Sequence, residues 1–118
     1  MKQVIVVRSD LNMPPGKVAA QVAHASMTNA VVAVSGKELT AKGAEWFHHP
    51  TLIVCRVGTY EELMFVHSRA LEAKIDIHLW QDAVDTETAG IIQTVTCLAL
   101  GPDVEEKLDT VTGKLPLY

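Results

Sequence analysis

The apolar positions of the chain fall into two patterns, short continuous runs and longer segments with helical spacing. Residues 3–8 (QVIVVR) and 51–57 (TLIVCRV) are apolar without alternation, which is typical of strands covered on both faces. Residues 75–81 (IDIHLWQ) alternate, so we expect a strand at an edge of the sheet with one face more exposed. Residues 94–100 (TVTCLAL) complete the set of predicted strands.

Proline and glycine mark the ends of the first two predicted helices. One helix is expected over residues 14–34, because two prolines and a glycine precede its apolar residues and Gly36 follows them. A shorter helix is expected within residues 37–47, because Pro50 follows it and the residue before a proline disfavours helix.

Two capping boxes mark the starts of the other helices. Residues 59–62 (TYEE) and 103–106 (DVEE) both have this form, and the second of these helices is expected to end at Gly113. On the helix that begins at Thr59, one face is apolar and is expected to turn inward. Its residues are Leu63, Val66, Ala70 and Leu71.

The resulting order, β-α-α-β-α-β-β-α, predicts an α/β fold in a single domain over residues 1–118. We expect a three-layer sandwich, with a mixed four-stranded sheet and helices on both faces. The acidic segment 82–90 (DAVDTETAG) has no helical pattern, so it is predicted to be a loop joining an antiparallel strand pair. Ligands of open α/β sheets bind beyond the carboxyl ends of the strands, which places this loop and residues 9–17 at one rim.

The helix over residues 14–34 carries a narrow polar line on an apolar surface. At 100° per residue its polar side chains fall within a stripe of about 60°. Such a line must face water, a ligand or hydrogen-bonding partners in the core, because buried polar groups without partners are costly. The line consists of Lys17, Gln21, His24 and Thr28, and the neighbours expected to be mostly buried are Ala19, Ala20, Val22, Ala23 and Ala25.

Lys17 stands in the first turn of this helix, where its charge opposes the helix dipole. The free N–H groups of a first turn attract anions, so a lysine beside them suggests a site for a phosphate or another oxyanion. The alternative, from the residues alone, is a solvated lysine that happens to begin a helix.

Composition disfavours several classes of protein. A net charge of −4 disfavours a generic nucleic-acid binder, because such domains are usually basic. No apolar run approaches the roughly 18 residues of a membrane helix, and the N-terminal run is too short for a signal peptide. Cys55 and Cys97 lack metal-ligand spacing, so we expect reduced, structural cysteines and no metal site. Together with the absence of a long apolar run, this predicts a cytoplasmic protein without membrane association.

Residues 6–26 (VVRSDLNMPPGKVAAQVAHAS) resemble the opening of the type 2 peptidyl-tRNA hydrolases. In that family a strand ending in Val-Arg-x-Asp-Leu is followed by Gly-Lys-x-Ala-Ala-Gln-x-x-His-Ala, which residues 16–25 match. Three later segments resemble the family in the same order. They are 82–86 (DAVDT), similar to its Asp-Ala-Gly-x-Thr loop, 94–102 (TVTCLALGP), similar to its last strand, and 109–115 (DTVTGKL), similar to its C-terminal signature.

This resemblance covers nearly the whole chain and implies a fold and an activity. The family has a mixed four-stranded sheet with helices on both faces, and its members hydrolyse the ester joining a peptide to the 3′ end of tRNA without a metal. The resemblance therefore implies peptidyl-tRNA or N-blocked aminoacyl-tRNA as substrate and no cofactor, and we add the expectation of a homodimer. The implied catalytic residues are Lys17, Asp82, Thr86 and Thr96, and the implied substrate-binding residues are Gln21, His24, Arg8 and Thr94.

Ester hydrolysis needs a positioned water, an acceptor for its proton and donors for the oxyanion. Asp82 is expected to be the base or to orient the water, and Lys17 to bind a phosphate or stabilise the oxyanion. Val84 and Asp85 depart from the family pattern, which has Gly and commonly Arg there, and an acidic residue disfavours phosphate. The alternative interpretation is therefore a non-catalytic relative that keeps the fold as a binding module, although the retained Lys17, Asp82 and Thr86 favour the enzyme.

Overall fold

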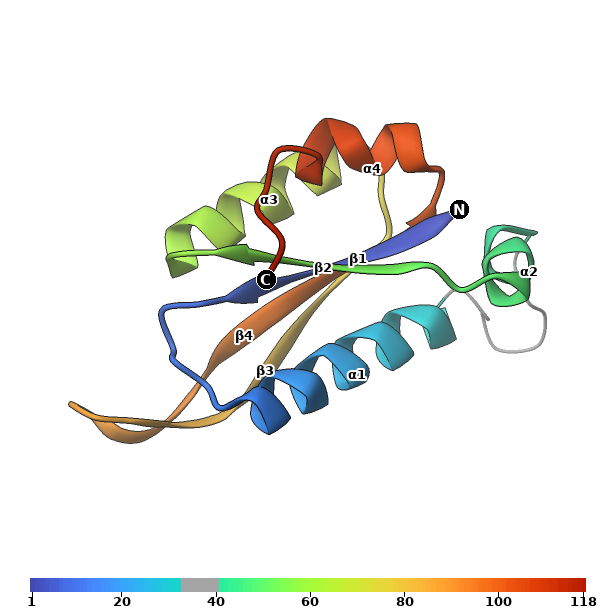
Figure 1. The fold of residues 1–118 in the computed structure, drawn as a ribbon. Coiled ribbons are helices and arrows are strands. Elements are labelled where there is room, and N and C mark those ends of the chain that lie inside the picture. Colours follow the sequence, from blue (N-terminus) through green and yellow to red (C-terminus); the bar gives the residue numbers. More distant parts are fainter. Residues whose placement is uncertain (33–40) are drawn as a thin grey trace.

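The computed structural model describes residues 1–32 and 41–118, and within them four strands and four helices follow the predicted order (Figure 1). The predicted end of the first helix at Gly36, and the first residues of the predicted second helix, lie outside the described residues. The elements are β1 (Lys2–Arg8), α1 (Pro15–Val32), α2 (Ala41–His48), β2 (Leu52–Val57), α3 (Tyr60–Glu72), β3 (Ile77–Thr86), β4 (Gly90–Asp103) and α4 (Glu105–Thr112).

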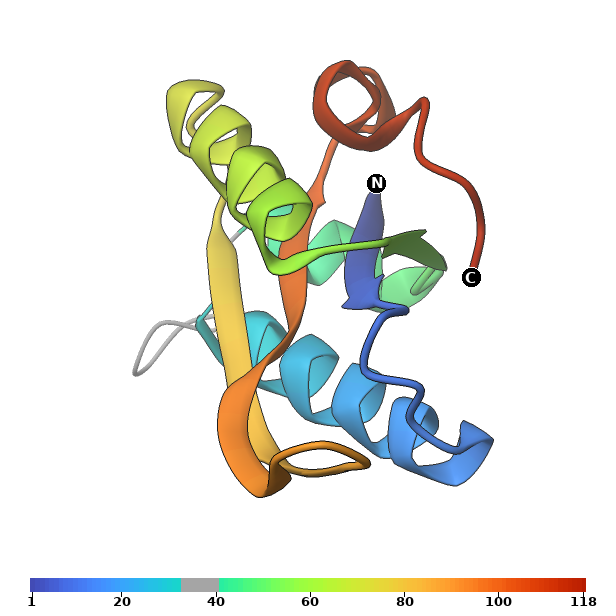
Figure 2. The same ribbon diagram turned by 90° about the vertical axis from the view of Figure 1, so that its left-hand side faces the viewer.

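The four strands form one mixed sheet in the order β2-β1-β4-β3. β1 and β2 run parallel, whereas β4 is antiparallel to both of its neighbours. α1 covers one face of the sheet, and α3 and α4 cover the other (Figures 1 and 2). This arrangement confirms the predicted three-layer fold, the antiparallel pairing of the last two strands and the edge position of β3. None of the described helices is long and apolar enough to cross a membrane.

The central strand β1 separates two apolar cores. Val4 and Val6 pack into the core beneath α3 and α4, whereas Ile5 and Val7 pack into the core beneath α1. All four side chains are at most 1% exposed. The continuous apolar run of β1 therefore has the predicted cause, a strand covered on both faces.

The same prediction is wrong for β2, which lies at the other edge of the sheet. Cys55 and Val57 are buried toward α3, but Leu52 and Arg56 on the opposite side are exposed. The C-terminal segment pairs with the free side of this strand, where the N–H of Tyr118 donates to the carbonyl of Val54 at 3.0 Å. The apolar run thus predicts that a strand forms here. Whether both faces of the strand are covered depends on its position in the sheet, which the run does not reveal.

The segment 82–90 is not a loop, because β3 continues to Thr86 and β4 begins at Gly90. The two strands form a long hairpin that projects beyond the start of α1 (Figure 1). Val84 pairs with Ile92 and is buried in the core beneath α1, while Asp85 is exposed. Asp85 is therefore a solvent-facing position of a strand rather than the sign of an irregular loop.

The expected burial around α1 is also wrong in part. Ala25 is buried and Ala20 and Val22 are half-buried, but Ala19 and Ala23 are exposed. The reason is that α1 has the sheet on one side only, and its polar line faces that sheet. The helix therefore turns small apolar residues to solvent.

Of the two predicted capping boxes, only the first is present. The N–H of Glu62 donates to Oγ1 of Thr59 at 3.0 Å, and α3 begins there. α4 instead begins after Val104, whose side chain has no acceptor for a cap. The Asp103 carboxylate accepts from the N–H of Val104 and binds Lys42 and Lys107. α4 ends at Gly113 as predicted. On α3, Leu63, Val66 and Ala70 are buried as expected, whereas Leu71 is 57% exposed.

Candidate active site

The first two turns of α1 place two side chains against β3. Nζ of Lys17 lies 2.9 Å from Oδ2 of Asp82, and Nε2 of Gln21 donates to the same oxygen at 2.7 Å. Lys17 and Gln21 are one helical turn apart, so both face the strand. The Lys17 and Asp82 side chains are 35% and 33% exposed, which leaves the ion pair open to solvent on one side.

Thr96 of β4 extends this network into the protein interior. Its Oγ1 lies 2.7 Å from Oε1 of Gln21, and both side chains are fully buried. A carboxylate can only accept hydrogen bonds, so Asp82 requires the amide nitrogen of Gln21 to face it. The amide oxygen then faces Thr96, whose hydroxyl must donate. Hydrogen bonds therefore run in one direction from Thr96 through Gln21 to Asp82.

A β-bulge explains how Thr96 reaches α1. Trp80 pairs with Cys97 and Gln81 pairs with Val95, which leaves Thr96 without a partner in the ladder. Cys97 belongs to the core beneath α1, yet its neighbour Thr96 also faces α1 through Gln21. Simple alternation would send two adjacent side chains to opposite faces, and bulges re-aim side chains in this way.

Three donors lower the pKa of Asp82 from 3.8 to about 2. The largest cause is the hydrogen bond from Gln21, followed by the one from Lys17 and by the N–H of Ala83, which lies 2.7 Å from Oδ1. Each donor stabilises the charged form. Asp82 is therefore a carboxylate at neutral pH.

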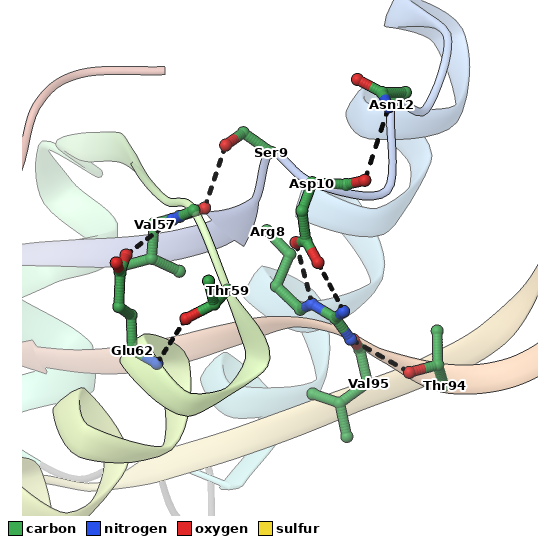
Figure 3. Close-up of polar contacts among 10 residues, drawn as sticks. Arg8, Ser9, Asp10, Asn12, Val57, Thr59, Glu62, Thr94 and Val95 are labelled. Carbon is green, nitrogen blue, oxygen red and sulfur yellow. Dashed lines mark hydrogen bonds and ion pairs between the residues drawn. The ribbon is translucent and has the colours of Figure 1, made fainter.

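A second cluster holds the loop that leads to α1 (Figure 3). The guanidinium of Arg8 donates to both carboxylate oxygens of Asp10, at 3.1 and 2.8 Å. Nη1 of Arg8 also donates to Oγ1 of Thr94 and to the carbonyl of Val95, both at 3.1 Å. The side chain of Arg8 is only 10% exposed. Arg8 and Thr94 thus tie the end of β1 to β4.

The structure does not bring every predicted site residue to the Lys17–Asp82 pair. Oγ1 of Thr86 donates to the carbonyl of Gly90 at 2.7 Å and accepts from the N–H of Ala89, so it closes the hairpin turn. His24 lies one turn beyond Gln21, with its ring 4.9 Å from that of Trp80. Among the described residues, Nδ1 of His24 and Nε1 of Trp80 have no hydrogen-bond partner.

An apolar pocket of about 330 Å³ opens beside Lys17. It lies between the loop before α1 and the β3–β4 hairpin. Its residues are Asn12, Met13, Pro14, Lys17, Ala83, Val84, Asp85 and Ile91.

Within residues 1–32 and 41–118, no three His, Cys, Asp or Glu side chains are grouped closely enough to hold a metal ion. Lys17 and Asp82 provide a cation and a carboxylate beside an apolar pocket.

Comparison with known proteins shows the family to which the chain belongs. The family model described as peptidyl-tRNA hydrolase PTH2 matches residues 1–118. The chain belongs to the PTH2 family. A protein named peptidyl-tRNA hydrolase from Methanopyrus kandleri is 44% identical over 117 residues, which cover 98% of this chain and 97% of that protein.

Two further relatives carry the same name. The protein from Nanoarchaeum equitans is 40% identical over 120 residues, covering 100% of this chain and 99% of its own. The protein from Methanothermobacter thermautotrophicus is 40% identical over 119 residues, covering 99% of each chain. Membership of the PTH2 family confirms the resemblance inferred from the sequence motifs.

Two residues of this PTH2 site were missed by sequence reasoning. The alternation of residues 75–81 predicts Trp80 on the more exposed face of its strand, but it packs against the core beneath α1, with its ring tilted by 36° against that of His24. Met13 is 7% exposed and forms part of the pocket wall, although nothing in the loop sequence indicated an inward side chain. Trp80 lies on the side of β3 opposite Leu79, as the alternation predicts, but α1 covers that side, and the sequence pattern of the strand does not show this.

Proposed function

We propose that the chain hydrolyses the ester bond between a peptide, or an N-blocked amino acid, and the 3′ end of tRNA. The observation that carries this proposal is the solvent-accessible Lys17–Asp82 pair, formed by the two motifs in which the chain resembles the PTH2 family. In the reaction, the oxygen of a water bonds to the ester carbonyl carbon, and the bond to the 3′ oxygen breaks. A proton from the water ends on that 3′ oxygen.

We assign Asp82 to orienting the attacking water rather than to removing its proton. A carboxylate with a pKa of about 2 is a weak base at neutral pH, far from the value that favours proton transfer. A carboxylate can accept about four hydrogen bonds. Among the described residues, three groups donate to the Asp82 carboxylate, so one acceptor position remains for water. The open side of the ion pair is where that water would bind.

Lys17 is assigned to the substrate's negative charge. An ammonium group has three donors, and one of them binds Asp82. The others can reach the oxyanion that develops on the ester carbonyl, or a phosphate near the 3′ end. Donors that are already in place need no rearrangement when this charge develops, and such donors contribute on the order of 10²–10³ in rate.

The buried members of the site are assigned positioning roles. Gln21 and Thr96 are fully buried, so we propose that they act through Asp82 by fixing its orientation and charge. Arg8 and Thr94 hold the loop before α1, and Thr86 holds the hairpin that forms the opposite wall. Direct substrate contact by His24 stays a prediction.

The reaction is further proposed to need no metal, to occur in the cytoplasm and to be carried out by a homodimer. Support for the first point is the site itself, where Lys17 supplies the positive charge that a metal would otherwise bring. Exposed apolar residues on the outer side of α1, including Met27 at 62%, are a candidate surface for a second copy. Sedimentation velocity on the purified chain tests the dimer, and a single monomeric species at micromolar concentration would refute it.

The decisive experiment is a deacylation assay of the purified chain with N-acetyl-aminoacyl-tRNA. We expect turnover that a chelator such as EDTA leaves unchanged, and a loss of at least about 10²-fold in Lys17→Ala with an unchanged melting temperature. Inhibition by EDTA with rescue by zinc would refute the metal-free mechanism. Binding of the substrate without hydrolysis would instead favour the non-catalytic binding module.

A further inference from the structure

The pocket beside Lys17 has a marked contrast between its walls and its rim. Met13 and Val84 are 7% and 3% exposed and form part of its floor, while Ile91 stands at 75% exposure on the hairpin. The polar contributions come from Lys17, Asn12 and the exposed carboxylate of Asp85. An apolar interior with a few polar groups at the edge is the usual form of a small-ligand site.

The pocket and the proposed reaction centre share one residue. Lys17 lines the pocket and its Nζ binds Asp82, so a carbonyl group held at this ammonium lies at the mouth of the pocket. Two groups of the proposed substrate flank that carbonyl. One is the side chain of the esterified amino acid, and the other is the terminal nucleoside of the tRNA.

We infer that this pocket binds the side chain of the amino acid that is esterified to the tRNA, and that it selects apolar side chains. This inference rests on the proposed hydrolase function and deepens it by naming a selectivity site.

The charge of Asp85 decides between the two groups. A terminal nucleoside carries a phosphate on its 5′ side, and Asp85 would place a carboxylate beside it, an unfavourable contact. An aliphatic side chain gains from the apolar walls, because burying apolar surface is favourable and roughly proportional to the area removed from water. The same carboxylate repels acidic side chains. We therefore expect the order leucine above glycine above aspartate.

The test measures kcat/KM for N-acetyl-leucyl, N-acetyl-glycyl and N-acetyl-aspartyl esters of one and the same tRNA. We expect the leucyl ester to exceed the glycyl ester on the order of 10-fold, within the range that a few methylenes in an apolar pocket supply. Each ratio is taken within one protein preparation, so a partly unfolded variant does not distort it.

Two variants assign the selectivity to the pocket. Ile91→Ser removes part of the apolar wall and should lower the leucyl-to-glycyl ratio at least threefold, while Asp85→Asn should raise the aspartyl-to-glycyl ratio. Leu71→Ser, a change of an exposed apolar residue on α3 at the opposite face of the sheet, is the matched control and should change neither ratio.

A leucyl-to-glycyl ratio near one in the parent protein would overturn the inference. Equal loss with all three esters in Ile91→Ser would also overturn it, because the pocket would then bind a part common to all substrates, such as the terminal nucleoside. Hydrolysis of the glycyl ester in either case keeps the proposed function intact. Absence of hydrolysis with every ester would refute the proposed function, and this inference with it.

Discussion

Nζ of Lys17 and Oδ2 of Asp82 lie 2.9 Å apart, although 65 positions separate the two residues in the chain. The pair forms because the N-terminal turn of α1 lies against the β3–β4 hairpin, on the face that α1 covers. Lys17 binds Asp82 directly, and the amide of Gln21 donates to the same carboxylate oxygen. Their contributions to activity should therefore be coupled.

The first prediction concerns this coupling. Lys17→Met and Asp82→Asn should each lower kcat/KM on the order of 10²-fold, and the double variant should fall by far less than the product of the two, because the residues act as a unit. Steady-state kinetics on one N-acetyl-aminoacyl-tRNA checks this. Fully multiplicative losses would mean that the ion pair has no joint role.

A second prediction concerns the bulge residue Thr96. Thr96→Val keeps the shape but removes the donor to Gln21, so a buried acceptor is left unpaired at a cost of about 1–3 kcal/mol in the free energy of unfolding. The pKa of Asp82, followed by the carbon chemical shift of its carboxyl, should rise, and kcat should fall with little change in KM. Thr96→Ser should restore both, whereas a merely space-filling Thr96 would leave the pKa of Asp82 unchanged in the valine variant.

The third prediction is a pH dependence of stability. The pKa of Asp82 is 3.8 without its partners and about 2 in the folded protein, so its ionised form stabilises the fold. That contribution is fully present above pH 3.8 and is lost as the pH falls toward 2. The unfolding free energy of the parent, measured relative to that of Asp82→Asn, should be constant near neutral pH and should decrease over this window. A difference that grows with acidification would contradict the sign.

A fourth prediction concerns binding of tRNA. The exposed cation at the site is Lys17, while Arg8 is held by Asp10 and Lys42 pairs with Asp103, so few phosphates should be neutralised. The logarithm of the binding constant should fall against that of salt with a slope of roughly −2 to −3, equivalent to two or three phosphates at about −0.9 each.

Asp85→Arg should tighten the binding of tRNA and steepen this slope. Fluorescence titrations across a salt series would show both effects. A steep slope in the parent protein, without gain from this substitution, would mean that another basic surface carries the tRNA.

The fifth prediction uses two alanines of α1 with opposite exposure. Ala25 is fully buried against the sheet, so Ala25→Leu should overpack the contact and cost about 1–3 kcal/mol in unfolding free energy. Ala23→Leu should stay within about 0.5 kcal/mol of the parent, because Ala23 is exposed. Denaturant melts of the two variants give the comparison, and equal losses would mean that both sides of α1 are packed.

The sequence predicts the parts of this fold whose signals are local. The apolar run of β1, the capping box at Thr59 and the terminal Gly113 are written in neighbouring residues, and the structure has the expected elements there. The resemblance to the family motifs also predicts the candidate site, because it assigns Lys17 and Asp82, which are far apart in the chain, to one site. The same motifs do not say that the Thr86 side chain closes the hairpin turn.

What the sequence does not predict depends on contacts between distant segments. The exposure of Ala23 follows from the single sheet that α1 covers, and the exposed side of β2 follows from its edge position. The acidic segment around Val84 has no helical pattern and predicts a loop, whereas pairing with the next strand makes it part of β3. The inward turn of Thr96 depends on a bulge, which is a property of strand pairing rather than of either strand.

Burial of the thiols gives the chain a practical use in labelling chemistry. The chain has two cysteines, Cys55 and Cys97, and both are free and buried. Burial raises the pKa of both thiols, that of Cys97 to about 11, and only the thiolate reacts with maleimides. A cysteine introduced at the exposed hairpin tip, as in Thr88→Cys, would therefore take up a fluorophore selectively while the native thiols stay in place. Such a probe would report the arrival of a ligand at the hairpin in real time, without first building a cysteine-free protein.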